Sequence, residues 1–339
     1  MSLSVSVAID AMGGDYGPRV TVPAAFHCLS IHPELTLIFI GNQEAIKAAL
    51  PANAADFQVR YDIVPTDTVV AMDESPASAL RNKKNSSMAV ALSLVKEGRA
   101  SACVSAGNTG ALMMLGRSVL GTHEGIDRPA FITEVPTLNG HCHVLDLGAN
   151  LDCTSKQLYQ FALMGSIVSR AVDGCMQPRV GLLNVGREEI KGNELVKETA
   201  KLLKGQSPLN YIGFVEGDDI FSGQVDVVVC DGFVGNVALK ASEGVAKMIG
   251  GLLKQALQKN LLTRTVGLLI RPTLEKLSEQ INPKERNGAS LLGLEGIVIK
   301  SHGNADVRSF CQAIKRATRE VETNVPQLIS DSILKHHFK

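Results

Sequence analysis

The amino-acid sequence predicts an α/β protein built on a doubly wound, mostly parallel β-sheet. Near-continuous apolar runs such as residues 35–41 are typical of strands that helices cover on both faces. Between most of these runs lie segments with apolar residues at helical spacing, which is the alternation that this architecture requires. A chain of 339 residues, of which 45% are hydrophobic, can bury a large core, either as one unit or as two closely joined lobes.

Strands and helices alternate in the first part of the chain. Alternation of apolar with small or polar residues over 5–9 predicts a strand that ends at Asp10. A helix with one apolar stripe is expected to begin after Asn85 or Ser86 and to stop at Gly98. Further strands are expected at 35–41, 59–64 and 103–105, and further helices at 24–29 and after residue 110.

The second part of the chain continues the alternation. Residues 291–300 form a further apolar segment, and residues 307–321 carry one apolar stripe and are expected to form a long helix. The remaining expected strands, with helices between most of them, are 130–135, 142–147, 180–185, 211–215 and 225–230.

Polar, glycine-containing segments follow five of the expected strands. In a parallel sheet the carboxyl ends of the strands share one edge, and ligands bind in the crevice there. We therefore expect a site where these segments converge, although Asp, Asn and Gly also make good turns and helix caps, which is the simpler interpretation of any one of them. The five segments begin at Asp10, Ser105, Asp146, Asn184 and Asp231.

The segment that begins at Ser105 has the composition of a phosphate-binding loop. Small residues let backbone N–H groups approach an anion, and the helix that follows adds unpaired donors and the positive end of its dipole. A turn without a ligand is the alternative. The residues expected to form this loop are Ser105, Ala106, Gly107, Asn108, Thr109 and Gly110.

Several side chains near the expected strand ends are candidates for chemistry. His302 lies at an element junction, where it could carry a proton or stabilise an oxyanion. Lys191 and Lys240 follow polar strand ends and could hold an anion, or they could be solvated surface lysines. Cys230 ends an apolar run and is expected to be buried and inert. A less favoured alternative is a Mg²⁺ site built from Asp10, Asp15, Asp146 and Asp231.

Residues 243–281 differ in character from the rest of the chain. An amphipathic helix is expected from 243 to 258, followed by a hydrophobic turn between Arg264 and Arg271 and a second helix from Pro272. Apolar residues with basic flanks at the tip of a hairpin suit an anionic membrane surface. A dimer interface or core packing is the alternative. The apolar residues at the expected tip are Leu261, Leu262, Leu268 and Leu269.

Composition narrows the classes of function. The 34 basic and 34 acidic residues balance, and Trp is absent, so nucleic-acid binding is not expected. Seven scattered cysteines without C-x-x-C spacing are expected to be unpaired in a reducing compartment. The N-terminus lacks the pattern of a signal peptide, which favours a cytoplasmic protein. The motifs G-x-S-x-G, Walker A and G-x-G-x-x-G are missing.

Six motifs along the chain form one recognisable set, and they are residues 8–18, 104–113, 145–150, 183–186 with 191–192, 230–236 with 239–240, and 300–303. Together these motifs resemble those of the bacterial acyl-[acyl-carrier-protein]:phosphate acyltransferase family, and the resemblance runs through nearly the whole chain. Arg187 stands where the family usually has an acidic residue, and Ser101 replaces a common Asp, which leaves fine specificity open.

The resemblance implies a single phosphate acyltransferase domain over residues 1–339. Its fold would be that of the isocitrate/isopropylmalate-dehydrogenase-like class, related to phosphotransacetylases, with residues 243–281 as a projecting helical hairpin. It implies a homodimer without a nicotinamide cofactor that transfers a long-chain acyl group from an acyl carrier protein to inorganic phosphate, and no other cofactor is expected. The acyl phosphate would serve phospholipid synthesis at the inner face of the cell membrane, beside a membrane glycerol-3-phosphate acyltransferase.

A mechanism of direct acyl transfer to phosphate suggests hypothetical roles for individual residues. Catalysis would fall to His302, Asn108, Asn236 and Lys191. Phosphate and acyl contacts would come from Asp10, Gly13, Gly14, Ser105, Gly107, Thr109, Gly110, Asp146, Asn150, Asn184, Asp231 and Lys240. Charges that dock the acidic carrier would be Arg81, Lys83, Lys84, Lys254 and Arg264.

Two other functions fit parts of the pattern. One is a metal- and NAD-dependent hydroxyacid dehydrogenase on the same fold. The other is a non-catalytic sensor of lipid or phosphate.

Overall fold

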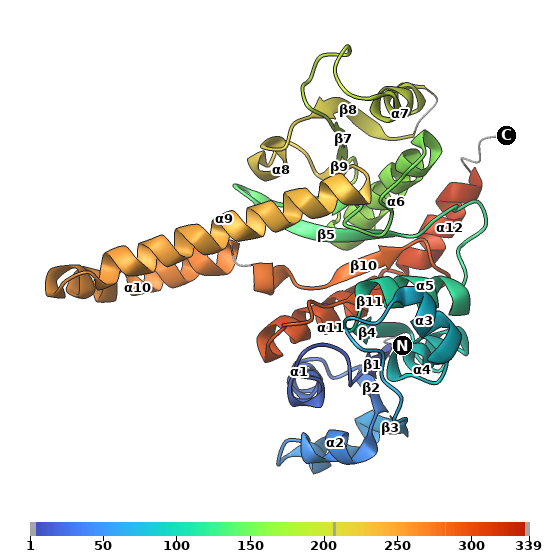
Figure 1. Cartoon of the computed structure of the whole chain (residues 1–339), viewed down its shortest axis with the longest axis vertical. Helices are drawn as coiled ribbons and strands as arrows, with labels where there is room; N and C mark the ends of the chain where they lie inside the picture. The colour runs from blue at the N-terminus through green and yellow to red at the C-terminus, as the bar shows by residue number, and fades with distance from the viewer. Residues whose placement is uncertain (1–4, 206–207, 282, 336–339) are drawn as a thin grey trace.

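An eleven-stranded mixed sheet runs through the whole molecule (Figure 1). The computed structural model describes residues 5–205, 208–281 and 283–335. Strand order is β3-β2-β1-β4-β11-β10-β5-β6-β9-β7-β8, and most neighbours pair in parallel, which confirms the predicted α/β class. The strands are β1 (Val5–Asp10), β2 (Leu35–Gly41), β3 (Tyr61–Pro65), β4 (Ala102–Ser105), β5 (Ala130–Thr137), β6 (Gly140–Leu145), β7 (Arg179–Leu183), β8 (Asn210–Val215), β9 (Val227–Val229), β10 (Ala289–Leu292) and β11 (Ile297–Lys300).

Strands β10 and β5 divide the sheet into two parallel sets that run in opposite directions. The pairs β11–β10, β10–β5 and β5–β6 are antiparallel. Strands β3, β2, β1, β4 and β11 therefore point one way, and β6, β9, β7 and β8 point the other way. The expectation that all five polar segments leave the same edge of a parallel sheet is wrong for this reason.

The two sets nevertheless end at the same level of the sheet. Leu145, the last residue of β6, lies opposite Ile132, which pairs with Ser290, which in turn pairs with Ile299. Ile299 precedes the last residue of β11. The strands of both sets thus stop near one row across the middle of the sheet, and the segments that follow them leave this row in opposite directions.

Helices cover both faces of the sheet. On one face α1 and α11 pack together over β1, β2 and β4, and α4 and α5 cover the other face. In the second half α6 packs against α7, α12 and β9. The helices are α1 (Pro18–Ile31), α2 (Gln43–Ala48), α3 (Pro76–Asn82), α4 (Ser87–Lys96), α5 (Thr109–Val119), α6 (Ser155–Asp173), α7 (Glu194–Lys204), α8 (Asp219–Ser222), α9 (Gly232–Gln258), α10 (Leu261–Ile281), α11 (Val307–Glu322) and α12 (Val325–Lys335), with 3₁₀ turns η1 (Ala54–Arg60) and η2 (Pro283–Arg286).

Element boundaries follow local hydrogen bonds. Ser86, not Asn85, caps α4, because its hydroxyl accepts the N–H of Ala89 at 3.3 Å. Strand β3 begins at Tyr61 because η1 occupies the residues before it. The apolar segment 291–300 forms parts of two strands, β10 and β11, that pair with one another.

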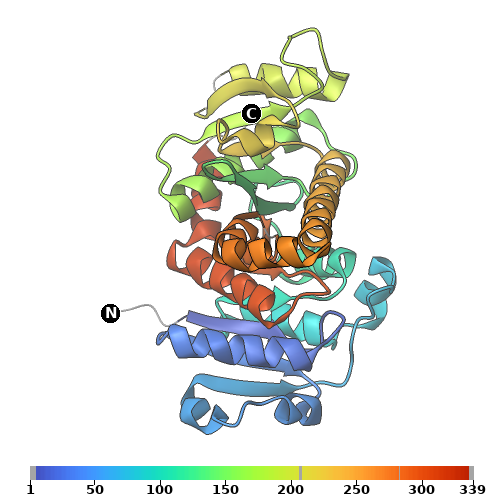
Figure 2. The same ribbon diagram turned by 90° about the vertical axis from the view of Figure 1, so that its left-hand side faces the viewer.

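The projecting helical hairpin consists of α9 and α10, which leave the body side by side (Figure 1) and point toward the viewer in Figure 2. The predicted hydrophobic turn is wrong, because α10 already begins at Leu261 and Pro272 lies inside it. Asn260 causes the early start, since its side chain accepts the N–H of Thr263 at 2.9 Å. Helix α9 begins at Gly232, before the expected 243. No helix in the described part of the chain has both the length and the apolar character of a membrane span.

One cysteine pair departs from expectation. The structure pairs Cys28 of α1 with Cys311 of α11 as a disulfide, with their Cα atoms 6.2 Å apart. The two residues lie 283 positions apart in sequence, so their spacing carried no signal of this contact. Cys230 is buried, as predicted, and burial raises the pKa of its thiol.

Candidate active site

Three loops at the ends of β1, β4 and β11 pack against one another. Ser105 donates from its hydroxyl to the buried Asp10 carboxylate at 2.6 Å and accepts the N–H of Gly107 at 3.0 Å. A Cβ on Gly13 would lie 2.7 Å from Asp10 Oδ2 and 2.8 Å from the Gly107 nitrogen, so only glycine fits this contact. Gly14 packs equally closely on the carbonyl of Gly303. These residues therefore support the loops from within.

Asn108 organises the start of α5. Its side-chain oxygen accepts the N–H of Ala111 at 3.0 Å, and its amide donates to the carbonyls of Met72 and Glu74, both at 2.9 Å. Both faces of the amide are thus engaged in holding the backbone. This geometry supports a structural role for Asn108 and does not favour the predicted donation to an oxyanion.

Asp146 has a similar structural role after β6. Its buried carboxylate accepts the N–H groups of Phe131, Leu147, Ala149 and Asn150, and the side-chain amide of Asn150 as well. Burial raises the pKa of Asp146. With all these donors engaged, neither Asp146 nor Asn150 offers a free donor to phosphate.

Asp231 is the N-cap of α9, where its carboxylate accepts the N–H of Val234 at 2.9 Å. The cap starts a helix that carries Asn236 and Lys240 into the centre of the molecule. For Asp231, as for Asn108 and Asp146, the turn-and-cap interpretation explains the side chain.

A polar pocket of about 140 Å³ lies where the two sets of strands end. It is lined by residues from the start of α5, the loop after β6, α9 and the end of β11, and therefore does bring several of the predicted segments together. Its polar and charged lining includes Thr109, Asn236, Lys240, Lys300, Ser301 and His302.

Lys300 is the cation that sequence reasoning missed. It ends the buried strand β11 with a side chain that is almost wholly buried, and its ammonium group donates to the carbonyls of Ala106, at 3.4 Å, and Ser301. Burial lowers the pKa of Lys300 to about 8. A lysine directly after three apolar strand residues was the available signal, because a buried ammonium group needs a partner.

His302 lies between the pocket and the hairpin. Its Nε2 is 3.8 Å from Oε1 of the buried Glu243, whose other oxygen accepts from Lys240 at 2.9 Å. Burial lowers the pKa of His302, and the neighbouring lysines act in the same direction. Asn287 holds the loop in place, because its side chain accepts the N–H of His302 at 3.0 Å and donates to Ser301.

An apolar pocket of about 330 Å³ adjoins the polar one. The two pockets share Thr133, Leu239 and His302. Val135, Pro136, Leu138, Phe221 and Ala246 supply the apolar wall along β5, α8 and α9. The site thus combines a small compartment suited to an anion with a larger one suited to a hydrocarbon.

Some predicted residues lie away from the polar pocket. Lys191 is exposed in the loop after β7, and Asn184 packs beneath Gly192 and donates to the carbonyl of Gly186 at 3.0 Å. Neither lines the polar pocket.

The predicted carrier-docking residues do not form one surface. Arg81, Lys83 and Lys84 lie at the end of α3, whereas Lys254 and Arg264 lie on the hairpin. Figure 1 shows these elements on opposite sides of the molecule.

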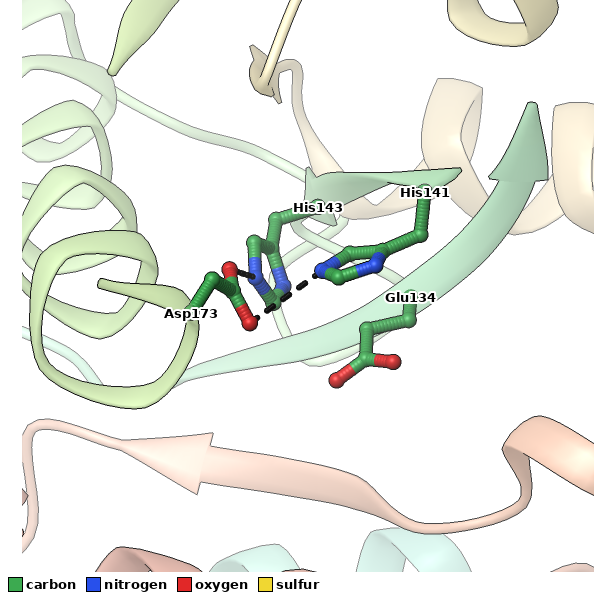
Figure 3. Close-up of side chains that lie close together, drawn as sticks. All are labelled: Glu134, His141, His143 and Asp173. Carbon is green, nitrogen blue, oxygen red and sulfur yellow. Dashed lines mark hydrogen bonds and ion pairs between the residues drawn. The ribbon is translucent and has the colours of Figure 1, made fainter. Parts of the chain in front are cut away.

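Glu134, which also lines the apolar pocket, belongs to a cluster of ionisable side chains with His141, His143 and Asp173 (Figure 3). Nε2 of His143 is 2.6 Å from Asp173 Oδ2, and Nε2 of His141 is 3.2 Å from Oδ1 of the same carboxylate. Glu134, the fourth member, is ion-paired with Arg316 and with Arg286, the latter at 3.3 Å. Two guanidinium groups on Glu134 favour an ion-pair network over a cation site.

The fold places the chain among proteins built like phosphotransacylases. A phosphotransacetylase from Streptococcus pyogenes superposes with a TM-score of 0.61 at 17% identity, covering 97% of this chain and 95% of that one. The phosphotransacetylase EutD from Staphylococcus aureus gives 0.56 at 14% identity, covering 96% and 94%. At these identities the likeness concerns the fold alone.

Sequence comparison identifies the family. The pattern described as "Fatty acid synthesis protein" matches residues 5–328. A phosphate acyltransferase from Alkalilimnicola ehrlichii is 54% identical over 333 residues, covering 98% of this chain and 97% of its own. One from Methylococcus capsulatus is 56% identical, covering 96% of each chain. The chain belongs to the phosphate acyltransferase family, and the predicted family and enzyme class are confirmed.

Proposed function

We propose that the protein transfers a long-chain acyl group from an acyl carrier protein to inorganic phosphate, releasing acyl phosphate and the free carrier. The observation that carries this proposal is that the polar pocket, which contains Lys300, and the apolar pocket share lining residues, among them His302. Membership in the phosphate acyltransferase family supports the same reaction. We take residues 1–339 to act as one domain.

Phosphate would occupy the polar pocket. Lys300 and Lys240 supply positive charge there, and Thr109 and Gly110 begin α5 with the N–H groups of a helix N-terminus. The buried ammonium group of Lys300 attracts an anion more strongly than the ammonium group of an exposed lysine would, because water screens its charge less.

The reaction would be a direct displacement. A phosphate oxygen attacks the thioester carbonyl carbon, a C–O bond forms, the C–S bond breaks and the electron pair leaves with sulfur. A thiolate with a pKa near 8.5 leaves without a strong acid, so no covalent enzyme intermediate is needed. His302, which lines both pockets, and Asn236, which lines the polar one, would donate to the developing oxyanion, and such donation is typically worth about 3 kcal/mol per donor.

The acyl chain would lie in the apolar pocket beside α9. Helix α9 is also part of the projecting hairpin, so the acyl chain would lie next to it. The exposed apolar residues of the hairpin would contact the membrane and a second copy of the chain. A homodimer at the inner face of the cytoplasmic membrane, passing acyl phosphate to a membrane glycerol-3-phosphate acyltransferase for phospholipid synthesis, is the setting that we propose. No cofactor enters this mechanism.

One assay tests the reaction. The protein is mixed with a long-chain acyl carrier and phosphate, free carrier thiol is followed, and acyl phosphate is trapped with hydroxylamine. We expect thiol release that depends on phosphate and equals the hydroxamate formed. Absence of phosphate-dependent release would reject the proposal, and binding without turnover would favour a sensor. Family membership already argues against the dehydrogenase alternative.

A further inference from the structure

A third pocket, which we call the α5 pocket, lies beside the polar one and has no part in the mechanism above. Its volume is about 420 Å³. Leu80, Met113, Met114, Pro129 and Ala149 line its apolar wall. Its polar lining consists of Arg117, Ser118, Arg128 and Asn150.

One face of helix α5 lines both the polar pocket and the α5 pocket. Thr109 lines the polar pocket, and Met113 and Arg117 line the α5 pocket at successive steps of four residues along α5. Residues at this spacing share one helix face, and the rise from Thr109 to Arg117 is about 12 Å. The loop after β6 separates the two pockets, with Leu147 in one and Ala149 in the other.

Both arginines of the α5 pocket are available to a ligand. Arg117 and Arg128 are exposed, and in the part of the chain that the structure describes no carboxylate forms an ion pair with either one. The contact formed by Arg128 is a long one, 3.5 Å, to the carbonyl of Asp152. Arg81, the next residue after Leu80 on α3, adds a third exposed guanidinium nearby.

We propose that the α5 pocket binds the flexible arm of the acyl carrier and that the three arginines dock the acidic carrier itself. The arm joins a phosphodiester to a thioester through an amide-containing chain. Its phosphodiester fits Arg117 and Arg128, its chain lies along α5 past Met113, and its thioester reaches the polar pocket at Thr109. This assignment rests on the proposed function and moves carrier docking from Lys254 and Arg264 to α3 and α5.

Charge complementarity favours a protein over a small ligand here. Inorganic phosphate alone needs no apolar wall that extends away from the catalytic pocket. Coenzyme A carries the same arm but lacks an acidic protein surface to meet Arg81. The substrate series below separates these occupants.

The test is charge reversal at the pocket, in the variant Arg117→Glu/Arg128→Glu. KM is measured for an acyl carrier, for acyl coenzyme A, for an acyl thioester of N-acetylcysteamine, which has no phosphate, and for inorganic phosphate. We expect KM for the acyl carrier to rise about tenfold, and KM for the N-acetylcysteamine thioester and for phosphate to stay the same. In the wild-type enzyme, salt should raise KM for the carrier, and the variant should lose most of this dependence.

Lys47→Glu/Arg99→Glu is the matched control, because it changes the net charge equally at exposed positions away from the pockets. The neutral variant Arg117→Gln/Arg128→Gln, with a smaller expected rise, covers the case in which charge reversal impairs folding. An unchanged KM for the carrier, or an equal rise for the carrier and the N-acetylcysteamine thioester, would overturn the proposal. If KM for acyl coenzyme A rises as much as KM for the acyl carrier, the proposal that the arginines dock the carrier protein would be overturned.

A larger effect of Lys254→Glu/Arg264→Glu on the carrier KM would place docking on the hairpin instead and overturn the proposal. Failure of the proposed function has a different signature. In that case the wild-type enzyme releases no thiol from any thioester in the presence of phosphate, whereas a wrong docking site leaves the wild-type enzyme active and the variants unaffected.

Discussion

Lys300 shows how one buried residue defines the chemistry of the site. Its ammonium group lies inside a pocket where the protein supplies two backbone carbonyls as partners, and Asp10 lies near enough to raise its pKa against the effect of burial. An anion in the polar pocket would supply the missing countercharge. The residue therefore links the fold of β11 directly to phosphate binding.

Replacing Lys300 by Met should raise KM for phosphate about tenfold or more, because a hydrogen bond to a charged group is worth roughly 1.5–3 kcal/mol. Thiol release at varied phosphate measures the effect, with Lys47→Met as an exposed control. Since burial places the pKa of Lys300 at about 8, the cation is lost as pH rises through that value, and KM for phosphate should rise with it. A phosphate KM that is the same in the variant and the wild-type enzyme would exclude this role.

Asn108 belongs to the same loop but should behave differently. Asn108→Ala removes a helix cap and two bonds to the backbone at Met72 and Glu74, so we expect a loss of about 1–2 kcal/mol in the free energy of unfolding. Urea denaturation measures this loss. Asn236→Ala is the comparison, because its side chain is exposed in the pocket and should affect kcat while leaving stability unchanged. If the two variants have the same free energy of unfolding, the structural role of Asn108 would be contradicted.

The sequence predicted the positions of some site residues correctly and the roles of others wrongly. His302, Asn236, Thr109 and Lys240 do line the polar pocket. Asp146 and Asp231 mark strand ends as predicted, but both carboxylates are used as hydrogen-bond acceptors for the backbone. A sequence records that a carboxylate follows a strand and does not record how many N–H groups point at it.

Among the elements, the hairpin of α9 and α10 is distinguished by apolar side chains that remain exposed within the described part of the chain. Leu261, Leu262, Leu268 and Leu269 are 70–81% exposed. Exposed apolar surface of this extent marks an interaction site. Continuous helix through Leu261 and Pro272 makes the hairpin longer than the predicted helix–turn–helix.

Substituting Leu261, Leu262 and Leu268 by Gln should abolish binding to anionic liposomes while leaving turnover of a water-soluble thioester intact, because each leucine contributes about 2 kcal/mol when buried in apolar surroundings. Co-sedimentation with the liposomes measures binding. Thr265→Gln on the same helix is the control. If liposome binding is unchanged while the protein becomes monomeric in sedimentation, the hairpin serves the dimer and not the membrane.

At the scale of the whole molecule, the cluster of ionisable side chains that contains Glu134 ties the two halves of the fold together. Asp173 ends α6, His141 and His143 come from β6, and Arg316 on α11 reaches Glu134 on β5. Hydrogen bonds from both histidines outweigh burial and lower the pKa of Asp173, and the bond to Asp173 raises the pKa of His141. Burial lowers the pKa of His143.

These shifts predict how stability depends on pH. The contribution of Asp173 is present above the unfolded pKa of 3.8 and is lost as pH falls below it. The contribution of charged His141 is present below its unfolded pKa of 6.5 and is lost as pH rises through the raised folded value. His143 has the opposite effect on stability. Burial favours its neutral form, so His143 destabilises the fold as pH falls below its unfolded pKa of 6.5.

Asp173→Asn should therefore destabilise the protein more at about pH 5.5 than at about pH 8.5, since it removes the partner of a charged His141. Urea unfolding of the variant and the wild-type protein at both values measures the difference. Asp331→Asn, at an exposed position on α12, is the control. A destabilisation that does not change with pH would show that His141 is neutral throughout.

The α/β class, most strand and helix positions and the family follow from the amino-acid sequence alone, because these depend on local periodicity, turn chemistry and motifs that each lie within a dozen residues. How the strands assemble depends on the tertiary structure, since the antiparallel pair β10–β5, which joins the two sets of strands, links segments that lie far apart in the sequence. The tertiary structure also decided which polar residues serve the site, placing Lys300 inside and Lys191 outside. Burial and hydrogen-bond partners, which give each side chain its chemistry, come from residues far away in the chain.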